Sequence, residues 1–95
     1  MDRMLGNQFF LARNFSRAIP HLERVHEKYP QDLSTSQKLV LCYIFTAQLD
    51  RAKGRFLEML RDPSARELVQ PAPQNHLEEK ELFAYWTARL PSLPE

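Results

Sequence analysis

The sequence predicts an all-α protein, a single domain over residues 1–95 with two helix-turn-helix repeats at about 2–30 and 33–63 and a C-terminal capping helix at about 76–90. Three observations support this prediction. Apolar residues recur at helical spacing in successive segments. The pattern of large and small residues returns after about 34 residues. Prolines and capping residues separate the segments.

Each key residue of the first repeat has a packing reason. Gly6 and Ala18 are small enough to let two paired helices approach closely, and larger residues fill the volume between them. Pro30 ends the second helix, because proline lacks an amide hydrogen and restricts the residue before it. The residues in question are Leu5, Gly6, Phe9, Ala18, Leu22 and Pro30. Their order resembles the tetratricopeptide repeat (TPR) pattern W-x2-L-G-x2-Y…A-x3-F…P, although Asp2 stands in place of the tryptophan.

The resemblance recurs at the period of about 34 residues that this family has. The residue pairs at this offset are Leu5 and Leu39, Phe9 and Tyr43, Phe15 and Leu49, Ala18 and Ala52, Leu22 and Phe56, and Val25 and Met59. Two positions depart, because Val40 follows Gly6 and Ser64 follows Pro30 at this spacing. The resemblance implies two TPR-like repeats plus a capping helix, an α-α superhelix. A generic bundle of helical hairpins is the alternative.

The first repeat is expected to hold two helices. The first helix covers residues 2–13, with Asn14 as a left-handed cap at its end. The second helix begins near Ser16, which can cap it, and continues to about Lys28. Pro20 lies within this helix but near its start, so we expect a mild bend rather than a break.

The second repeat is expected to hold two more. Ser34 opens a sequence that resembles a capping box, which predicts a helix from there to about Gln48. The apolar run 39–45 inside this segment is also compatible with a buried strand, but the length of the segment favours a helix. Asp50 then caps a helix that ends at about Arg61.

The C-terminal third departs from the repeat. A short helical turn is expected over 64–69, and prolines over 71–73 then stop it. A last amphipathic helix follows Asn75 and continues to about Leu90. Repeat proteins need a terminal element with a polar outer face. We therefore expect this helix to dock Trp86 on the second repeat; packing on another copy of the chain is the alternative.

Composition restricts the classes of partner. The formal charge of +1 supplies no field that would attract nucleic acid or an anionic membrane. The longest nearly continuous apolar run, 39–45, is far shorter than the ~20 residues of a membrane-spanning helix. One cysteine, Cys42, cannot form an intramolecular disulfide, and the N-terminus lacks the features of a signal peptide. We expect a cytoplasmic protein without membrane insertion.

The sequence proposes no reaction. His21 and His26 are five residues apart, which is the wrong spacing for a pair of metal ligands on one helix face. Cys42 on an apolar helix is typical of an inert buried thiol. The two glycines form no phosphate-binding loop, and the basic residues at 51, 53 and 55 are typical of a solvated face. We expect no enzyme, no metal and no cofactor.

The resemblance implies a binding groove lined by the first helix of each repeat. The candidate groove residues are Arg3, Asn7, Phe10, Lys38, Leu41, Ile44 and Phe45. A subset of the TPR family binds acidic peptide C-termini through a clamp of five basic and amide residues. Arg3 and Asn7 match the first two clamp positions, and Lys38 stands where an asparagine is expected. Leu68 and Ala72 occupy the last two and cannot hold a carboxylate.

Two functional hypotheses follow. In the first, the chain is a protein-protein interaction module whose groove accepts a partner peptide or amphipathic helix, with an acidic residue near Arg3 and Lys38. In the second, the chain is a structural protein that buries the same apolar surface in a homo-oligomer. Alternatively, the apolar residues of the groove belong to the core and are covered by the C-terminal helix through Phe83 and Trp86.

Overall fold

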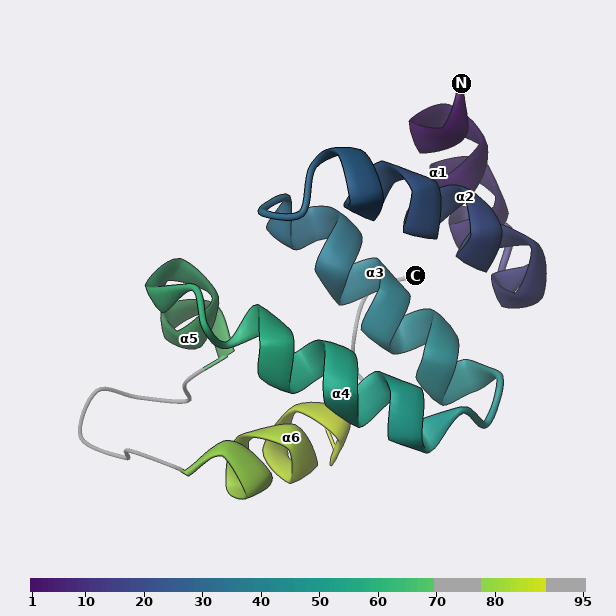
Figure 1. Ribbon diagram of the computed structural model, residues 1–95. Helices are drawn as coiled ribbons and strands as arrows, with labels where there is room; N and C mark the ends of the chain where they lie inside the picture. Colours follow the sequence, from purple (N-terminus) through teal and green to yellow (C-terminus); the bar gives the residue numbers. More distant parts are fainter. Residues whose placement is uncertain (70–77, 89–95) are drawn as a thin grey trace.

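The computed structural model describes residues 1–69 and 78–88 (Figure 1). Within these residues it contains six helices and no strand, so the predicted all-α class is confirmed. The helices are α1 (Asp2–Leu11), α2 (Phe15–Lys28), α3 (Leu33–Phe45), α4 (Leu49–Met59), α5 (Pro63–Val69) and α6 (Glu79–Ala88).

Helices that follow one another along the chain pack against one another. α1 packs on α2, α2 on α3, and α3 on α4, so α1–α2 and α3–α4 form two successive hairpins. Figure 1 shows the turns of these hairpins at the same side of the molecule. The apolar segment 39–45 lies in α3, so the alternative of a buried strand is wrong.

The two hairpin turns have the same backbone geometry at corresponding positions of the two repeats. Arg13 and Ala47 are both left-handed, with φ of 63° and 61°. The following amide donates to a carbonyl five residues earlier in each turn, from Asn14 to Phe9 at 2.8 Å and from Gln48 to Tyr43 at 2.7 Å. This is the 6→1 hydrogen bond of the Schellman motif, which satisfies a carbonyl at the end of a helix.

The predicted cap between the first two helices needs correction. Asn14 caps α2 in place of Ser16, and its side-chain oxygen accepts from the amide of Arg17 at 3.4 Å. The left-handed residue that ends α1 is therefore Arg13, one position before the one expected. α2 continues past Pro20 to Lys28 as one helix.

The predicted caps of the second hairpin also need correction. Asp32 precedes α3, so the predicted capping box at Ser34 is wrong and Ser34 lies inside the helix. The Asp32 carboxylate accepts a hydrogen bond from the Thr35 hydroxyl at 2.7 Å. α4 begins at Leu49 after Gln48, which places Asp50 in the first turn instead of at the cap.

α5 begins at a proline. Asp62 precedes this helix, and its carboxylate accepts from the amide of Ser64 at 2.9 Å. Pro63 is the first helical residue, where its missing amide hydrogen costs no hydrogen bond. The helix therefore begins one residue before the expected segment 64–69. The segment forms a full helix of seven residues rather than a single turn.

The core combines buried residues of α2, α3, α4, α5 and α6. Ala18 on α2 and Ala52 on α4 are both 0% exposed, as the two small positions require. At Gly6, a Cβ atom would lie 2.9 Å from Cδ2 of Leu22, closer than real Cβ contacts allow. The glycine therefore permits the close approach of α1 and α2. The largest fully buried side chains among the described residues are Phe56, Leu22, Leu39, Leu82, Val40, Val69 and Cys42.

α6 packs on α4 (Figure 1). Leu82 is 0% exposed, and the ring of Phe83 meets that of Phe56 edge to face at a centroid distance of 5.2 Å. The terminal helix thus docks on the second hairpin, as expected, although it begins at Glu79 rather than after Asn75. The Trp86 side chain, which was predicted to take part, and Leu90, the expected end of the helix, lie outside what the structure describes.

Candidate functional site

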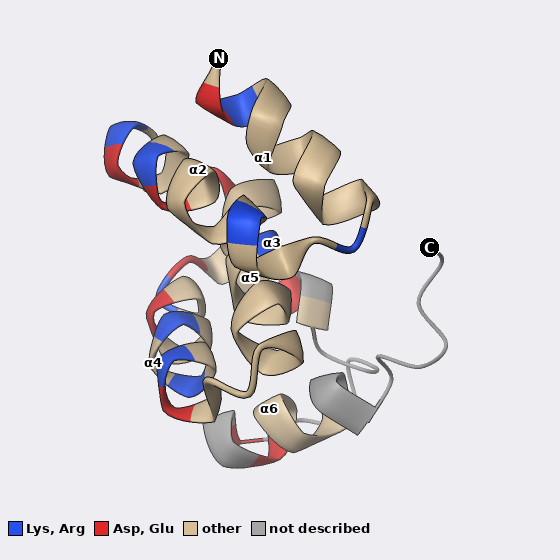
Figure 2. Ribbon diagram, turned by 90° about the vertical axis from the view of Figure 1, so that its right-hand side faces the viewer, with Lys and Arg blue, Asp and Glu red and all other residues tan. Residues whose placement is uncertain are grey.

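The faces of α1 and α3 differ in charge from those of α2 and α4. In α1 and α3 the charged residues are Asp2, Arg3 and Lys38. Figure 2 shows Lys, Arg, Asp and Glu concentrated on α2 and α4, while α1 and α3 are mostly uncharged. The first helices of the two hairpins therefore carry few charges, two basic and one acidic.

Lys38 links α1 to α3. Its Nζ donates a hydrogen bond to Oδ1 of Asn7 at 2.8 Å, and it lies 5.9 Å from the ring centroid of Phe10. An aromatic face and an amide oxygen are both favourable neighbours for the ammonium group. The structure thus brings together three of the seven predicted groove residues, from two helices that are separated in sequence.

A row of aromatic side chains continues from this point. The rings of Phe10 and Phe15 meet edge to face at 5.7 Å, and those of Phe15 and Phe45 are stacked at 4.7 Å. Phe45 was a predicted groove residue, and Phe15 was not. In the sequence, Phe15 appeared only as a repeat position paired with Leu49. A linear pattern does not show that the first residue of α2 contacts side chains of both α1 and α3.

Arg3 belongs to a different group of contacts. Its guanidinium donates to the Asp32 carboxylate at 2.8 Å and lies over the Tyr29 ring at 5.5 Å. The hydrogen bond from Thr35, and then the one from Arg3, lower the pKa of Asp32. The side chain expected to attract an acidic partner is therefore engaged by the turn between α2 and α3. More than half of the Arg3 side chain is exposed, so this pairing is open to competition.

The remaining predicted residues divide between surface and core. Ile44 and Phe10 are half-buried, and both pack against the core. Two of the residues that were predicted to line the groove therefore also make core contacts. Leu41 is half-buried, and Phe45 is 49% exposed. The last two clamp positions, the Leu68 side chain and Ala72, both lie outside the part of the chain that the structure describes.

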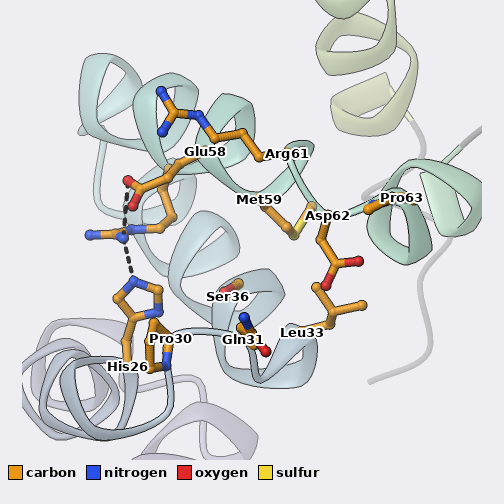
Figure 3. A pocket seen from close by; sticks show the side chains of 11 residues that line it. His26, Pro30, Gln31, Leu33, Ser36, Glu58, Met59, Arg61, Asp62 and Pro63 are labelled. Carbon is orange, nitrogen blue, oxygen red and sulfur yellow. Dashed lines mark hydrogen bonds and ion pairs between the residues drawn. The ribbon is translucent and has the colours of Figure 1, made fainter.

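A cavity of about 480 Å³ lies elsewhere, between the end of α2, the turn that follows it, the start of α3 and the end of α4 (Figure 3). In its wall, Nη1 of Arg55 lies 2.6 Å from Nε2 of His26 and donates to Glu58 at 3.4 Å. Burial, and then the charge of Arg55, lower the pKa of His26. A neutral His26 that accepts from Arg55 at Nε2 carries its proton on Nδ1.

This cavity was not predicted from the sequence. Among the described residues, Nδ1 of His26 and Nε of Arg55 are buried without a hydrogen-bond partner. The other groups in the wall include Arg61 and Asp62, so its basic and acidic side chains are balanced. The arrangement therefore has hydrogen-bonding capacity.

The thiol of Cys42 and the hydroxyl of Tyr43 belong to buried side chains. Cys42 is 0% exposed, and burial raises the pKa of its thiol to about 12, so it is protonated and inert at neutral pH. Burial, and then a hydrogen bond to Glu23, raise the pKa of Tyr43 to about 12. The Tyr43 hydroxyl therefore serves as a hydrogen-bond donor between α3 and α2.

The described residues contain neither a metal cluster nor a membrane span. Within 1–69 and 78–88, no group of three or more His, Cys, Asp or Glu side chains is arranged to hold a metal ion. Within the same part of the chain, no helix combines the length and apolar character needed to cross a membrane. Comparisons with sequence profiles of protein families, with curated proteins and with solved structures found no match to this chain.

Proposed function

We propose that the chain is a TPR-like protein-protein interaction module that binds its partner without catalysis. The observation that carries this proposal is the equal geometry of the two hairpin turns at corresponding repeat positions, Arg13 and Ala47. Helical hairpins that repeat after about 34 residues are typical of a TPR superhelix. The finer assignment as the start of a right-handed α-α superhelix is part of the proposal.

The proposed partner is an amphipathic helix laid along α1 and α3. Phe10, Leu41 and Phe45 supply an apolar strip, of which the first two are half-buried and the third is exposed. Lys38, held by Asn7, supplies a positive charge beside that strip. A helix with one apolar face and an acidic residue near Lys38 satisfies both features. An acidic residue of the partner can pair with Arg3 only by displacing Asp32. Lys38 is therefore the stronger of the two anchors.

A displayed library of amphipathic helical peptides supplies a ligand for the test. Selected peptides are expected to be acidic on one flank, and fluorescence anisotropy measures their affinity for the full chain. Leu41→Asp is expected to weaken binding by about tenfold or more, since it places a charge in the apolar contact. Its thermal midpoint, measured by circular dichroism, is expected to remain close to that of the parent.

Leu57→Asp is the matched control, because Leu57 is also a partly exposed leucine but lies on α4. It is expected to bind the selected peptide as the parent does. If Leu41→Asp unfolds the domain, Leu41 belongs to the core and the groove is rejected. Equal affinity of the parent and Leu41→Asp would also reject it.

A further inference from the structure

His26 and Arg55 connect two helices whose main neighbours are others. α2 packs mainly on α1 and α3, whereas α4 packs mainly on α3. Nη1 of Arg55, on α4, lies 2.6 Å from Nε2 of His26, on α2, and donates to Glu58 at 3.4 Å. We use the name latch for His26, Arg55 and Glu58. The dashed lines in Figure 3 mark both of its contacts, with the guanidinium between the other two side chains.

The latch requires a neutral His26. A guanidinium has only donors, so Nε2 of the imidazole has to accept, and the ring proton then lies on Nδ1. A protonated imidazole carries a hydrogen on both nitrogens and offers no acceptor. Protonation of His26 therefore replaces the hydrogen bond by a contact between two positive groups, which repel each other.

Two polar atoms of the latch have no partner even when it is closed. Among the described residues, Nδ1 of His26 and Nε of Arg55 are buried without a hydrogen-bond partner. A buried donor without an acceptor is unfavourable, because it has lost its hydrogen bonds to water. Separation of α2 from α4 returns both donors to water. The closed arrangement is therefore held less firmly here than in a fully hydrogen-bonded contact.

The cavity beside the latch leaves room for this separation. It has a volume of about 480 Å³ and lies between the end of α2, the start of α3 and the end of α4. Where the cavity separates α2 from α4, the two helices have no direct packing to lose. Their separation does not require α2 to leave α1 or α4 to leave α3.

The charges around His26 come from α2, from α4 and from the residues that follow α4. Burial, and then the positive charge of Arg55, lower the pKa of His26, whereas Glu58 on α4 and Glu27 on α2 raise it. Burial and Arg55 prevail, so the neutral form that the latch requires is present at neutral pH. The remaining charges of the cavity wall, Arg61 and Asp62, are opposite in sign, and α3 contributes the uncharged Leu33 and Ser36.

We propose that the latch is a proton-operated joint between the two hairpins. Protonation of His26 releases Arg55 toward Glu58, more than half of whose side chain is exposed, and the end of α2 moves away from the end of α4. Both hairpins remain folded, so the change is a local opening rather than unfolding of the domain. The proposal does not depend on the groove along α1 and α3, because no candidate groove residue belongs to the latch.

Nitrogen-15 nuclear magnetic resonance of the His26 ring in the full chain tests the closed state. The chemical shifts of Nδ1 and Nε2 show which of the two nitrogens carries the proton. We expect the proton on Nδ1 at pH 7.5 and on both nitrogens after acidification, with a midpoint below the ordinary pKa of 6.5. A proton on Nε2 at pH 7.5 overturns the proposal, because that nitrogen then cannot accept from Arg55.

Distances between spin labels, measured by double electron-electron resonance from pH 7.5 to pH 4.5, test the opening. Cysteines that replace the exposed residues Lys28 on α2 and Leu57 on α4 carry one pair of labels across the latch. A second pair at Ser34 on α3 and at Leu57 lies within the second hairpin. The buried Cys42 is not labelled, since it is 0% exposed. We expect the first distance to lengthen as His26 is protonated and the second to stay constant.

Three substitutions assign the opening to the latch. His26→Gln keeps an acceptor for Arg55 but does not titrate, so its distances are expected to be independent of pH. His21→Gln is the matched control, because His21 lies on the same helix but contacts Asp2, and it is expected to open as the parent does. Arg55→Gln removes the charge that repels the protonated ring and is expected to abolish the lengthening. It also provides the test if His26→Gln does not fold, which circular dichroism checks.

Three results of the distance measurements overturn the proposal. The first is a parent whose distance across the latch is the same at every pH. The second is lengthening that persists in a folded His26→Gln or Arg55→Gln variant. The third is equal lengthening of both label pairs, because it indicates unfolding of the second hairpin instead of opening between the hairpins.

Discussion

Among single residues, the smallest side chains set the distance between helices. Gly6 faces Leu22, and Ala18 and Ala52 have no exposed surface. The sequence predicted Gly6 and Ala18 correctly, because a small residue at a repeat position between large ones has few other packing roles. It did not show that Val40, the repeat counterpart of Gly6, is also fully buried, since a linear pattern carries no information on the volume available.

The two glycines provide a matched pair. Gly54 lies in α4 with open space around it, so Gly54→Ala is expected to raise the free energy of unfolding by about 0.5–1 kcal/mol through helix propensity. Gly6→Ala gains the same propensity but drives a Cβ into Leu22, and overpacking of a core costs about 1–3 kcal/mol. We expect a net loss of stability for Gly6→Ala in urea denaturation. An equal gain in both variants would contradict the close approach of α1 and α2.

Helix caps were the least predictable residues. Asn14 and Ser16 are both good N-cap residues two positions apart, and the choice depends on Arg13, whose left-handed backbone ends α1 and determines where α2 begins. Likewise, Asp32 rather than Ser34 precedes α3. Several acceptable caps lie within a few residues of each helix start. Only the geometry of the preceding turn selects one.

At the level of helices, α2 and α4 are connected by a contact between two side chains that are distant in sequence. His26 and Arg55 are 29 residues apart, and their nitrogens lie 2.6 Å apart in the cavity wall. No role for His26 was predicted, because its partner comes from another hairpin. A neutral imidazole is required here, since a protonated ring offers no acceptor to a guanidinium.

This contact predicts how stability depends on pH. The folded state lowers the pKa of His26 below its ordinary value of 6.5, so below that pH the unfolded chain binds the proton more readily than the folded chain. The His26 contribution to the free energy of unfolding is therefore full above about pH 6.5 and is lost as the pH falls through the folded pKa.

The comparison of urea denaturation at pH 7.5 and pH 5 measures this loss. At pH 5 the aspartates with lowered pKa values, Asp2 and Asp32, are still ionised, since their pKa values lie below the ordinary value of 3.8. His26→Gln keeps a side-chain oxygen that can accept from Arg55 but does not titrate, so it is expected to show a smaller loss. The same loss in the parent and the variant would contradict the assignment.

For the molecule as a whole, the fold class and the pairing of helices were predictable, because the hydrophobic pattern repeats after about 34 residues. The contacts among the candidate groove residues were predictable only in part. Asn7, Phe10 and Lys38 come together as expected. Arg3 does not join them, because Asp32 from the next turn engages it.

The proposed groove involves α1 and α3, the first helices of the two hairpins. The C-terminal helix α6 packs on α4, where the ring of Phe83 meets that of Phe56.

Chemical-shift mapping by nuclear magnetic resonance locates the binding surface residue by residue. The isotopically labelled chain is titrated with a selected acidic amphipathic peptide, and the backbone amide shifts are followed. We expect the largest changes in α1 and α3, around Asn7, Phe10, Lys38 and Leu41. Changes centred on His26 and Arg55, or on α4 and α6, with α1 and α3 unaffected, would contradict the proposal that the groove is the binding site.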